Sequence, residues 1–266
     1  MKKTNTSRVK PFFANGFKPA PALIALTLLL AGLPPQVSGE NLNPGIIPPQ
    51  AHPYGKSYGE WSALWWQWAY KLPVTGHPWF DATGADAAAG QSGPVWFLCG
   101  KAGLTLLEPG HLIGVATRNI TVPPGKALFF PILNWEDDNV GRDVPLTIEQ
   151  LWVEIKGLQD GATNMTCEID GRPVEGLSNG LTTPYRVQSP VFSYWLPPAD
   201  NFYQFSGYDL SGTIYPAIAD GVFLMLTPLS PGQHTLHFSG DLVDSANFPY
   251  LTLDITYHIT VDPHAK

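Results

Sequence analysis

Long apolar runs are scarce in this sequence, and none occurs after residue 33. A membrane-spanning helix needs about 20 apolar residues, so we do not expect one in the rest of the chain. The single run, Pro21–Leu33, is too short for a comfortable span and ends near Gly39. Five basic residues precede it: Lys2, Lys3, Arg8, Lys10 and Lys18.

This pattern is typical of a secretory signal peptide. We therefore expect residues 1–39 to be a signal peptide and the mature protein to be extracytoplasmic, either periplasmic or secreted. An uncleaved anchor is the alternative.

Basic residues are also few outside this segment. Five of the 15 Lys and Arg lie in residues 1–39, which hold no acidic residue, so 10 basic residues accompany 22 acidic ones in the rest of the chain. The chain after residue 39 therefore has a net charge of −12, and we do not expect it to bind nucleic acid. The acidic residues are spread along the chain, as on an ordinary solvated surface.

Cysteine is nearly absent, with Cys99 and Cys167 as the two examples. A metal site built on two cysteines without nearby histidine is not favoured. In an oxidising compartment the simplest interpretation is one disulfide between them. Two buried free thiols are the alternative.

The sequence lacks the strand–helix alternation that parallel α/β folds require. Instead it is rich in turn formers, with 26 Gly and 27 Pro. Tyr250–Val261 alternates apolar and polar residues, which indicates a strand with one wet face. We therefore predict a mainly β fold, a β-sandwich or jelly roll, in a single domain over residues 40–266. Other expected strands are Pro94–Cys99, Leu112–Thr117, Ile120–Val122, Lys126–Leu133, Asn164–Ile169, Arg172–Val174, Arg186–Trp195, Gly221–Leu226 and Gln233–Ser239.

Tryptophan is abundant, and four of the nine are packed into the segment SYGEWSALWWQWAYKLP, residues 57–73. Ser57 and Glu60 form a capping-box pattern and Pro73 ends the segment, which predicts a helix over residues 57–72. One arc of this helix is apolar and should dock on the sandwich. It holds Trp61, Leu64, Trp65, Trp68 and Leu72.

The opposite arc of the same helix is apolar as well and holds Ala63, Trp66 and Tyr70. We expect the loop Val74–Gly93, with Trp79 and Phe80, to fold over this arc. If it does not, exposed rings would mark an interaction surface. Trp66, Tyr70 and Trp79 are therefore the candidate ligand-binding residues, because such rings form stacking platforms for carbohydrates. Simple core filling is the alternative.

A second helix is predicted over residues 147–158, where Thr147 and Gln150 repeat the capping pattern. An acidic loop, Asn134–Asp143, precedes it. Its oxygen-bearing side chains resemble a calcium ligand set, although the spacing matches no EF-hand and an ordinary solvated loop is the alternative. We expect no other cofactor. The candidate ligands are Glu136, Asp137, Asp138 and Asp143.

Catalytic signatures are weak. The segment Gly90-Gln91-Ser92-Gly93 is one residue short of a nucleophile elbow and precedes its strand instead of following it. His237, His258 and Asp254 lie on the polar face of two terminal strands, where metal binding is less common than simple exposure. No pair of carboxylates has a spacing that identifies a glycosidase.

Five blocks of the sequence together resemble an uncharacterised family of small secreted bacterial proteins. They are YGEWSALWWQWA, GQSGPVWFL, VPPGKALFFPILN, YRVQSPVFSYWLP and DGVFLMLTPLSPGQHTLHFSG. The resemblance spans nearly all of the mature chain and implies secretion and a β fold, without an activity. It also implies a bridge in many members between the loop after D-x-T-G and the residue before T-V-P-x-G-K. These positions here are near Asp86 and at Asn119, so that bridge is absent.

Taken together, the sequence favours a non-enzymatic, extracytoplasmic β-sandwich that binds a carbohydrate or another protein. The alternative is a secreted hydrolase acting on polysaccharide or ester substrates, with carboxylates from the Asp81–Asp86 and Glu136–Asp143 segments. A hydrolase requires titratable groups that converge in one cleft, whereas a binding protein requires only suitably placed rings.

Overall fold

The structure is a computed structural model that describes Asn43, residues 45–108 and residues 110–264. The predicted signal peptide lies outside these residues. Helices are α1 (Tyr58–Lys71), α2 (Ile148–Asp160) and α3 (Phe202–Phe205), with short 3-10 turns η1 (Pro49–Ala51) and η2 (Pro53–Gly55). Strands are β1 (Val95–Phe97), β2 (Thr105–Glu108), β3 (His111–Val122), β4 (Ala127–Asp138), β5 (Ala162–Ile169), β6 (Arg172–Pro173), β7 (Arg186–Gln188), β8 (Phe192–Leu196), β9 (Gly212–Leu226), β10 (Gly232–Val243) and β11 (Pro249–Val261).

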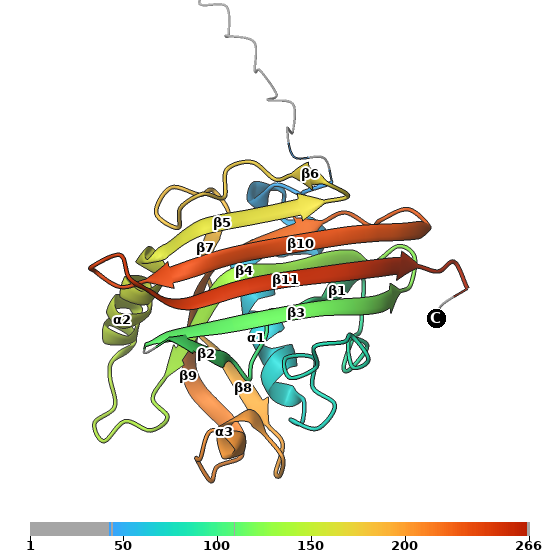
Figure 1. Ribbon diagram of the computed structural model, residues 1–266. Helices are drawn as coiled ribbons and strands as arrows, with labels where there is room; N and C mark the ends of the chain where they lie inside the picture. The colour runs from blue at the N-terminus through green and yellow to red at the C-terminus, as the bar shows by residue number, and fades with distance from the viewer. Residues whose placement is uncertain (1–42, 44, 109, 265–266) are drawn as a thin grey trace, which may run out of the picture. The chain divides into compact units, whose positions relative to one another are not determined.

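The strands form two sheets, which confirms the predicted β-sandwich with accessory helices (Figure 1). One sheet has the order β2-β3-β11-β10-β5-β6. The other has the order β1-β4-β9-β7, and β8 pairs with a further part of β9. Most pairs are antiparallel, but β1 with β4 and β3 with β11 are parallel.

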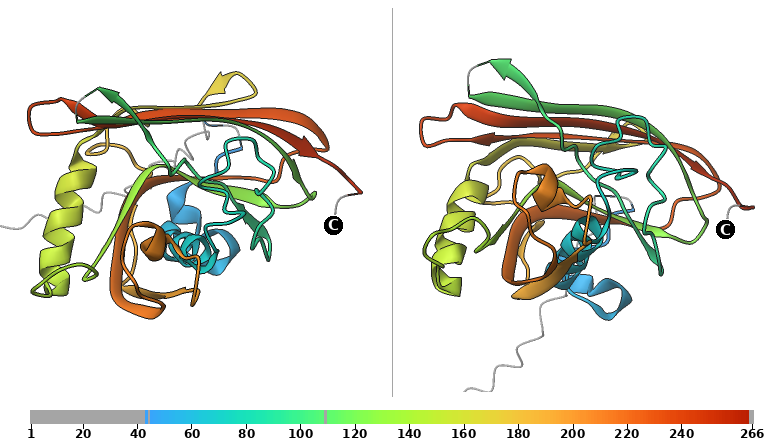
Figure 2. Two further views of the ribbon diagram at one scale, coloured as in Figure 1. Left: turned by 60° about the horizontal axis from the view of Figure 1, so that its bottom comes forward. Right: turned by 90° about the horizontal axis from the view of Figure 1, so that it is seen from below.

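The five-stranded sheet is the middle of three layers. On β4, Leu128 and Phe130 pack in the core between the sheets, while Ala127 and Phe129 pack against α1. Successive side chains of a strand point to opposite faces, so a strand covered on both sides reads as a continuous apolar run. Figure 2 shows the six-stranded sheet on one side of this layer and α1 on the other.

An irregularity interrupts this alternation within β4. The register with β9 shifts between Pro131 and Leu133, so that β4 carries one extra residue at this point. Proline lacks the N–H that a regular ladder uses, which is why it occurs at such bulges. After the bulge, the residues with even numbers face α1 instead of the six-stranded sheet.

Helix α1 begins at the predicted capping box, in which the Glu60 amide donates to Ser57 Oγ at 3.2 Å and the Ser57 amide donates to Glu60 Oε2 at 2.8 Å. The predicted docking arc packs as expected. Trp65 is 1% exposed, contacts Phe223 and donates its indole N–H to the Leu98 carbonyl at 2.8 Å. Helix α2 likewise begins at a capping box, formed by Thr147 and Gln150.

The long loop after α1 is held down by a buried arginine of β3, Arg118. Its guanidinium donates to the carbonyls of Pro78 and Asp81 in the loop and of Cys99 and Gly100 after β1, at 2.8–3.1 Å. The Tyr257 hydroxyl on β11 accepts a fifth bond at 2.7 Å. All five N–H groups of the side chain are therefore used.

The two positions that the family resemblance singles out border the same loop. The Asn119 amide donates to the Thr83 carbonyl at 2.8 Å, and a Cβ built on Gly84 would lie 2.5 Å from the Asn119 carbonyl oxygen. Gly84 also has a positive φ of 96°, so a side chain there is excluded by both space and backbone conformation. Backbone contact thus joins loop and strand here without a covalent bridge.

The predicted Cys99–Cys167 disulfide is not formed, since both residues are free thiols. Cys99 belongs to the cluster around α1, whereas Cys167 belongs to the core between the sheets. The Cys99 sulfur lies 3.8 Å from the Tyr257 hydroxyl. The alternative of two buried free thiols is therefore the one that the structure supports.

Within the part of the chain that the structure describes, no helix is long and apolar enough to cross a membrane.

Replacing the central ring of α1, Trp65→Ala, should lower the free energy of unfolding by about 3–5 kcal/mol, the usual effect of deleting a large buried aromatic. Val153 on α2 is 74% exposed, so Val153→Ala should stay within about 0.5 kcal/mol of the wild type. Urea unfolding of both variants measures the difference. A Trp65→Ala protein as stable as Val153→Ala would show that the arc is not core.

Both thiols should be inaccessible in the folded protein because both cysteines are buried. Unreduced protein treated with a thiol reagent in denaturant should label at Cys99 and Cys167, while the folded protein should label slowly at both. Mass spectrometry of the intact protein gives the count. If the unreduced, denatured protein took up no label, the two cysteines would be joined in a disulfide after all.

Candidate functional site

The segment expected to be an acidic loop is instead partly strand, and this correction defines the site. Strand β4 continues to Asp138, so Glu136, Asp137 and Asp138 alternate between its two faces. Glu136 and Asp138 are buried on the α1 side, at 8% and 5% exposure. Asp137 points the other way, toward Arg142, which it meets at 2.7 Å and which also contacts Glu154 of α2.

The predicted calcium set is therefore divided. Glu136 and Asp138 lie together, Asp137 is paired with Arg142, and Asp143 is exposed in the following turn. No group of three or more His, Cys, Asp or Glu side chains within the described ranges is arranged to hold a metal ion. Calcium binding stays a prediction without a convergent ligand set.

Tyrosine hydroxyls donate three of the four hydrogen bonds that the side chains of the two buried acids accept from the described residues. Tyr70 of α1 donates to Glu136 Oε2 at 2.8 Å. Tyr203 donates to Asp138 Oδ2 at 2.7 Å, and Tyr194 of β8 donates to the same oxygen. Burial raises the pKa of each of these phenols, so they remain protonated donors.

Small residues on β9 make room for these rings. Glu136 pairs with Ala219 and Asp138 with Ala217 across the ladder, and both alanines are fully buried. Because directly opposite residues share a face, larger side chains at these positions would fill the space that the tyrosines occupy. The rings of Tyr70 and Tyr194 accordingly approach to 4.3 Å between centroids.

Helix α3, which supplies Phe202 and Tyr203, lies in a segment where no helix or strand was predicted. Asn201 caps it by accepting the Gln204 amide at 2.9 Å, while Gln204 accepts the Asn201 amide in return. The Asn201-x-x-Gln204 spacing is the same signal that revealed α1 and α2. The apolar run behind it is only one turn long, which is too short for the local pattern to predict a helix.

Trp79 reaches the site from the loop after α1, where His77 fixes its position. The Trp79 amide donates to His77 Nδ1 at 3.0 Å, and His77 Nε2 lies 2.9 Å from the Ala69 carbonyl. One nitrogen accepts and the other donates, so the ring is a neutral imidazole. Burial lowers the pKa of His77, which is consistent with that tautomer.

The predicted fold-over of the loop is observed. Trp79 packs on Trp66 and Tyr70 with ring centroids 5.6 and 6.0 Å apart, and all three are buried. Phe80 packs instead on His77 and Phe205. The second apolar face of α1 is therefore covered by the protein itself.

A cavity of about 290 Å³ remains where these rings meet the two sheets. All three predicted ligand-binding residues line it, namely Trp66, Tyr70 and Trp79, and so does Glu136. The remaining lining residues are Trp65, Gly100, Lys101, Ala102, Leu104, Asn134, Trp135, Phe202, Tyr203, Leu251 and Leu253. We call this space the aromatic pocket.

Three buried polar atoms of the lining residues have no hydrogen-bond partner: Glu136 Oε1, Trp66 Nε1 and Asn134 Nδ2. Buried polar groups are nearly always paired, so such atoms usually await a water or a ligand. Burial raises the pKa of Glu136 well above its usual range, and the nearby Asp138 adds to the shift. Three of the lining residues thus carry a buried polar atom, two N–H donors and one carboxyl oxygen, that no other described protein group satisfies.

The hydrolase alternative receives less support from this arrangement. Glu136 is the one acidic residue among those that line the aromatic pocket. Asp138 is occupied by two tyrosines and by the Val140 amide at 2.6 Å. Asp81 accepts the amides of Thr83, Gly84 and Asp86 in its own turn.

A serine–histidine–aspartate set occurs elsewhere, on the surface, but its hydrogen bonds do not suit catalysis. His234 Nδ1 lies 2.8 Å from Asp170 Oδ2, and its Nε2 lies 2.9 Å from the Ser230 carbonyl but 3.4 Å from the Ser230 hydroxyl. Nε2 therefore donates to the carbonyl and does not take a proton from the hydroxyl. The other two histidines considered, His237 and His258, are not cross-strand partners. His237 opposes Thr256 and lies 2.8 Å from Asp254 Oδ1, while His258 opposes Thr235.

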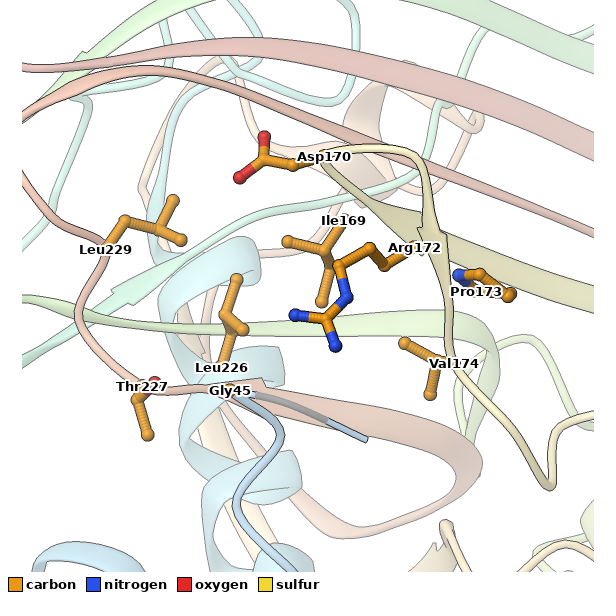
Figure 3. A pocket seen from close by; sticks show the side chains of 9 residues that line it. All are labelled: Gly45, Ile169, Asp170, Arg172, Pro173, Val174, Leu226, Thr227 and Leu229. Atoms are coloured by element: carbon orange, nitrogen blue, oxygen red, sulfur yellow. The ribbon is translucent and has the colours of Figure 1, made fainter. Parts of the chain in front are cut away.

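A smaller cavity of about 170 Å³ lies between the β5–β6 hairpin and the end of β9 (Figure 3). Leu226, Leu229 and Val174 supply apolar walls, and the Arg172 side chain extends over them. Asp170 is already engaged by His234 and by the Thr235 amide. This cavity offers no convergent polar groups.

Comparison with known proteins adds little. No model of a known protein family matches the chain, and no curated protein matches it. Among solved structures, the crystal structure of the cysteine protease inhibitor EhICP2 from Entamoeba histolytica is 13% identical over 56% of this chain and 96% of that chain. The TM-score is 0.19, which does not indicate a shared fold.

Glu136 should make stability depend on pH in a recognisable direction. An unfolded glutamate has a pKa of about 4.3, whereas the folded carboxyl keeps its proton to higher pH. The unfolded state thus loses this proton first, and its contribution to stability falls as pH rises above about 4.3. Glu136→Gln has no proton to lose and should gain stability relative to the wild type between about pH 4 and about pH 7.

Urea unfolding across that range measures the difference, with Glu168→Gln on the exposed face of β5 as the control. A constant difference between Glu136→Gln and the wild type would contradict a raised pKa at this site.

Proposed function

We propose that this protein is a small-molecule binding protein and that the aromatic pocket is its ligand site. The observation that carries the proposal is Glu136, which is 8% exposed, has one unpaired carboxyl oxygen, and lines a cavity in which seven of the fifteen lining residues are aromatic. Binding sites for small molecules combine apolar, aromatic walls with a few convergent polar groups in this way.

The size of the pocket suits a small ligand. Its volume of about 290 Å³ lies at the lower end of the range for ligand sites, roughly 300–1,000 Å³. A single sugar ring, the ligand class expected from the sequence, presents an apolar face to aromatic rings and polar groups to Asn134 and Glu136. A protein ligand would be limited to one inserted side chain.

A binding role is favoured over hydrolysis because one carboxyl, and not two, is available in the pocket. Glycoside hydrolysis in most families uses two carboxyl groups on either side of the bond that breaks. The absence of a serine elbow in the sequence agrees with this choice. We further propose that the predicted signal peptide exports the protein, so that it meets its ligand outside the cytoplasm.

Trp135 gives the sharpest test, because it lines the pocket and yet is 38% exposed, so its loss should affect binding more than folding. A panel of monosaccharides and small amines is titrated against the wild type by tryptophan fluorescence and calorimetry. Trp135→Ala should weaken any binding observed by about tenfold, which corresponds to about 1.4 kcal/mol.

The matched control is Trp195→Ala on β8, which is 47% exposed and does not line the pocket. It should bind like the wild type. Equal weakening by both variants would place the ligand elsewhere, and no binding by any compound of the panel would count against the function.

A further inference from the structure

The two buried acids at the aromatic pocket have no cationic partner. Across the described residues, neither Glu136 nor Asp138 forms an ion pair through its side chain. Arg142 reaches Asp138 through the main-chain carbonyl of that residue, and its guanidinium pairs with the carboxylates of Asp137 and Glu154. Buried charges are normally paired, so a negative charge on either carboxyl would have no compensating cation here.

The rings of the pocket form walls and not a flat platform. Trp79 stands nearly perpendicular to Trp66, Tyr70 and Phe202, with interplanar angles of 79°, 81° and 79°. A sugar stacks best on a flat, open ring, whereas a compact group enclosed by several rings meets more than one ring face. Ring faces carry the negative part of the aromatic quadrupole, which attracts cations.

We propose that the ligand of the aromatic pocket carries an ammonium group, which lies against the ring faces and pairs with the free oxygen of Glu136. The inference rests on the proposed function, because it assigns the chemical class of the ligand to the same site. Both a quaternary ammonium and the protonated amine of an amino sugar have this chemistry. Aromatic cages with an adjacent carboxylate suit such groups in general.

The charged and titratable groups that face Glu136 come from several elements. Asp138 lies two residues along β4, Tyr70 comes from α1, Tyr194 from β8 and Tyr203 from α3. Lys101, after β1, lines the same pocket and is the one basic residue to do so. Its charge opposes an entering cation, so Lys101→Met should tighten the binding of a cation.

Binding of a cation should release a proton. The raised pKa of Glu136 means that the carboxyl is protonated in the free protein over part of the pH range. A cation favours the ionised form, so its affinity should increase as pH rises toward the pKa of the free carboxyl. A neutral ligand of the same shape should show no such dependence.

Choline and its neutral isostere 3,3-dimethyl-1-butanol test the inference directly, because they differ in charge and hardly in shape. Isothermal titration calorimetry should show choline binding at least about tenfold more tightly, a difference of about 1.4 kcal/mol. Glu136→Gln should reduce the preference to the contribution of the ring faces, while Glu168→Gln, which removes an exposed acid, should retain it in full. Circular dichroism confirms that both variants fold.

The outcomes separate the two proposals. If choline and the isostere bind equally, or only neutral sugars bind, the pocket is a ligand site but the ammonium inference is wrong. If Glu136→Gln keeps the full preference for choline, the carboxyl is not its source and the inference is also wrong. If no compound binds at all, the proposed function fails and the inference fails with it.

Discussion

The buried guanidinium of Arg118 is the interaction on which the site depends. A buried charge must have its hydrogen-bonding groups satisfied, and here four main-chain carbonyls and one tyrosine hydroxyl do so without a carboxylate. The carbonyls belong to two segments that have no regular structure of their own. Those segments carry Trp79 and Lys101, so the pocket wall is fixed by a side chain that does not line the pocket.

Helices were predictable wherever a local signal was followed by enough apolar sequence. The capping boxes of α1 and α2 lie within four residues of chain, and the helices begin where expected. The aromatic content of α1 likewise predicted two buried faces. Helix α3 has the same signal, but its single turn is stabilised by rings from α1 and the loop, which a local pattern does not report.

The burial of Glu136 and Asp138 could not be predicted either, because it also depends on residues that are distant in the sequence. Five polar residues in the sequence NWEDDN suggest a solvated loop, because isolated carboxyls avoid burial. Their partners, Tyr70 and Tyr194, are 66 and 56 residues distant in the chain. The disulfide expectation failed similarly, since redox context predicts that cysteines pair but not on which layer of the fold each one lies.

Because of the bulge in β4, the site is sensitive to the insertion or deletion of a single residue in this strand. The side-chain period of a strand is two, so a shift of one residue exchanges its faces. Without the extra residue near Ile132, Asp137 would turn toward the tyrosines, and Glu136 would turn toward α2. Evolution can therefore exchange individual residues of the pocket gradually, whereas a single-codon deletion in this strand would replace the whole acidic face in one step.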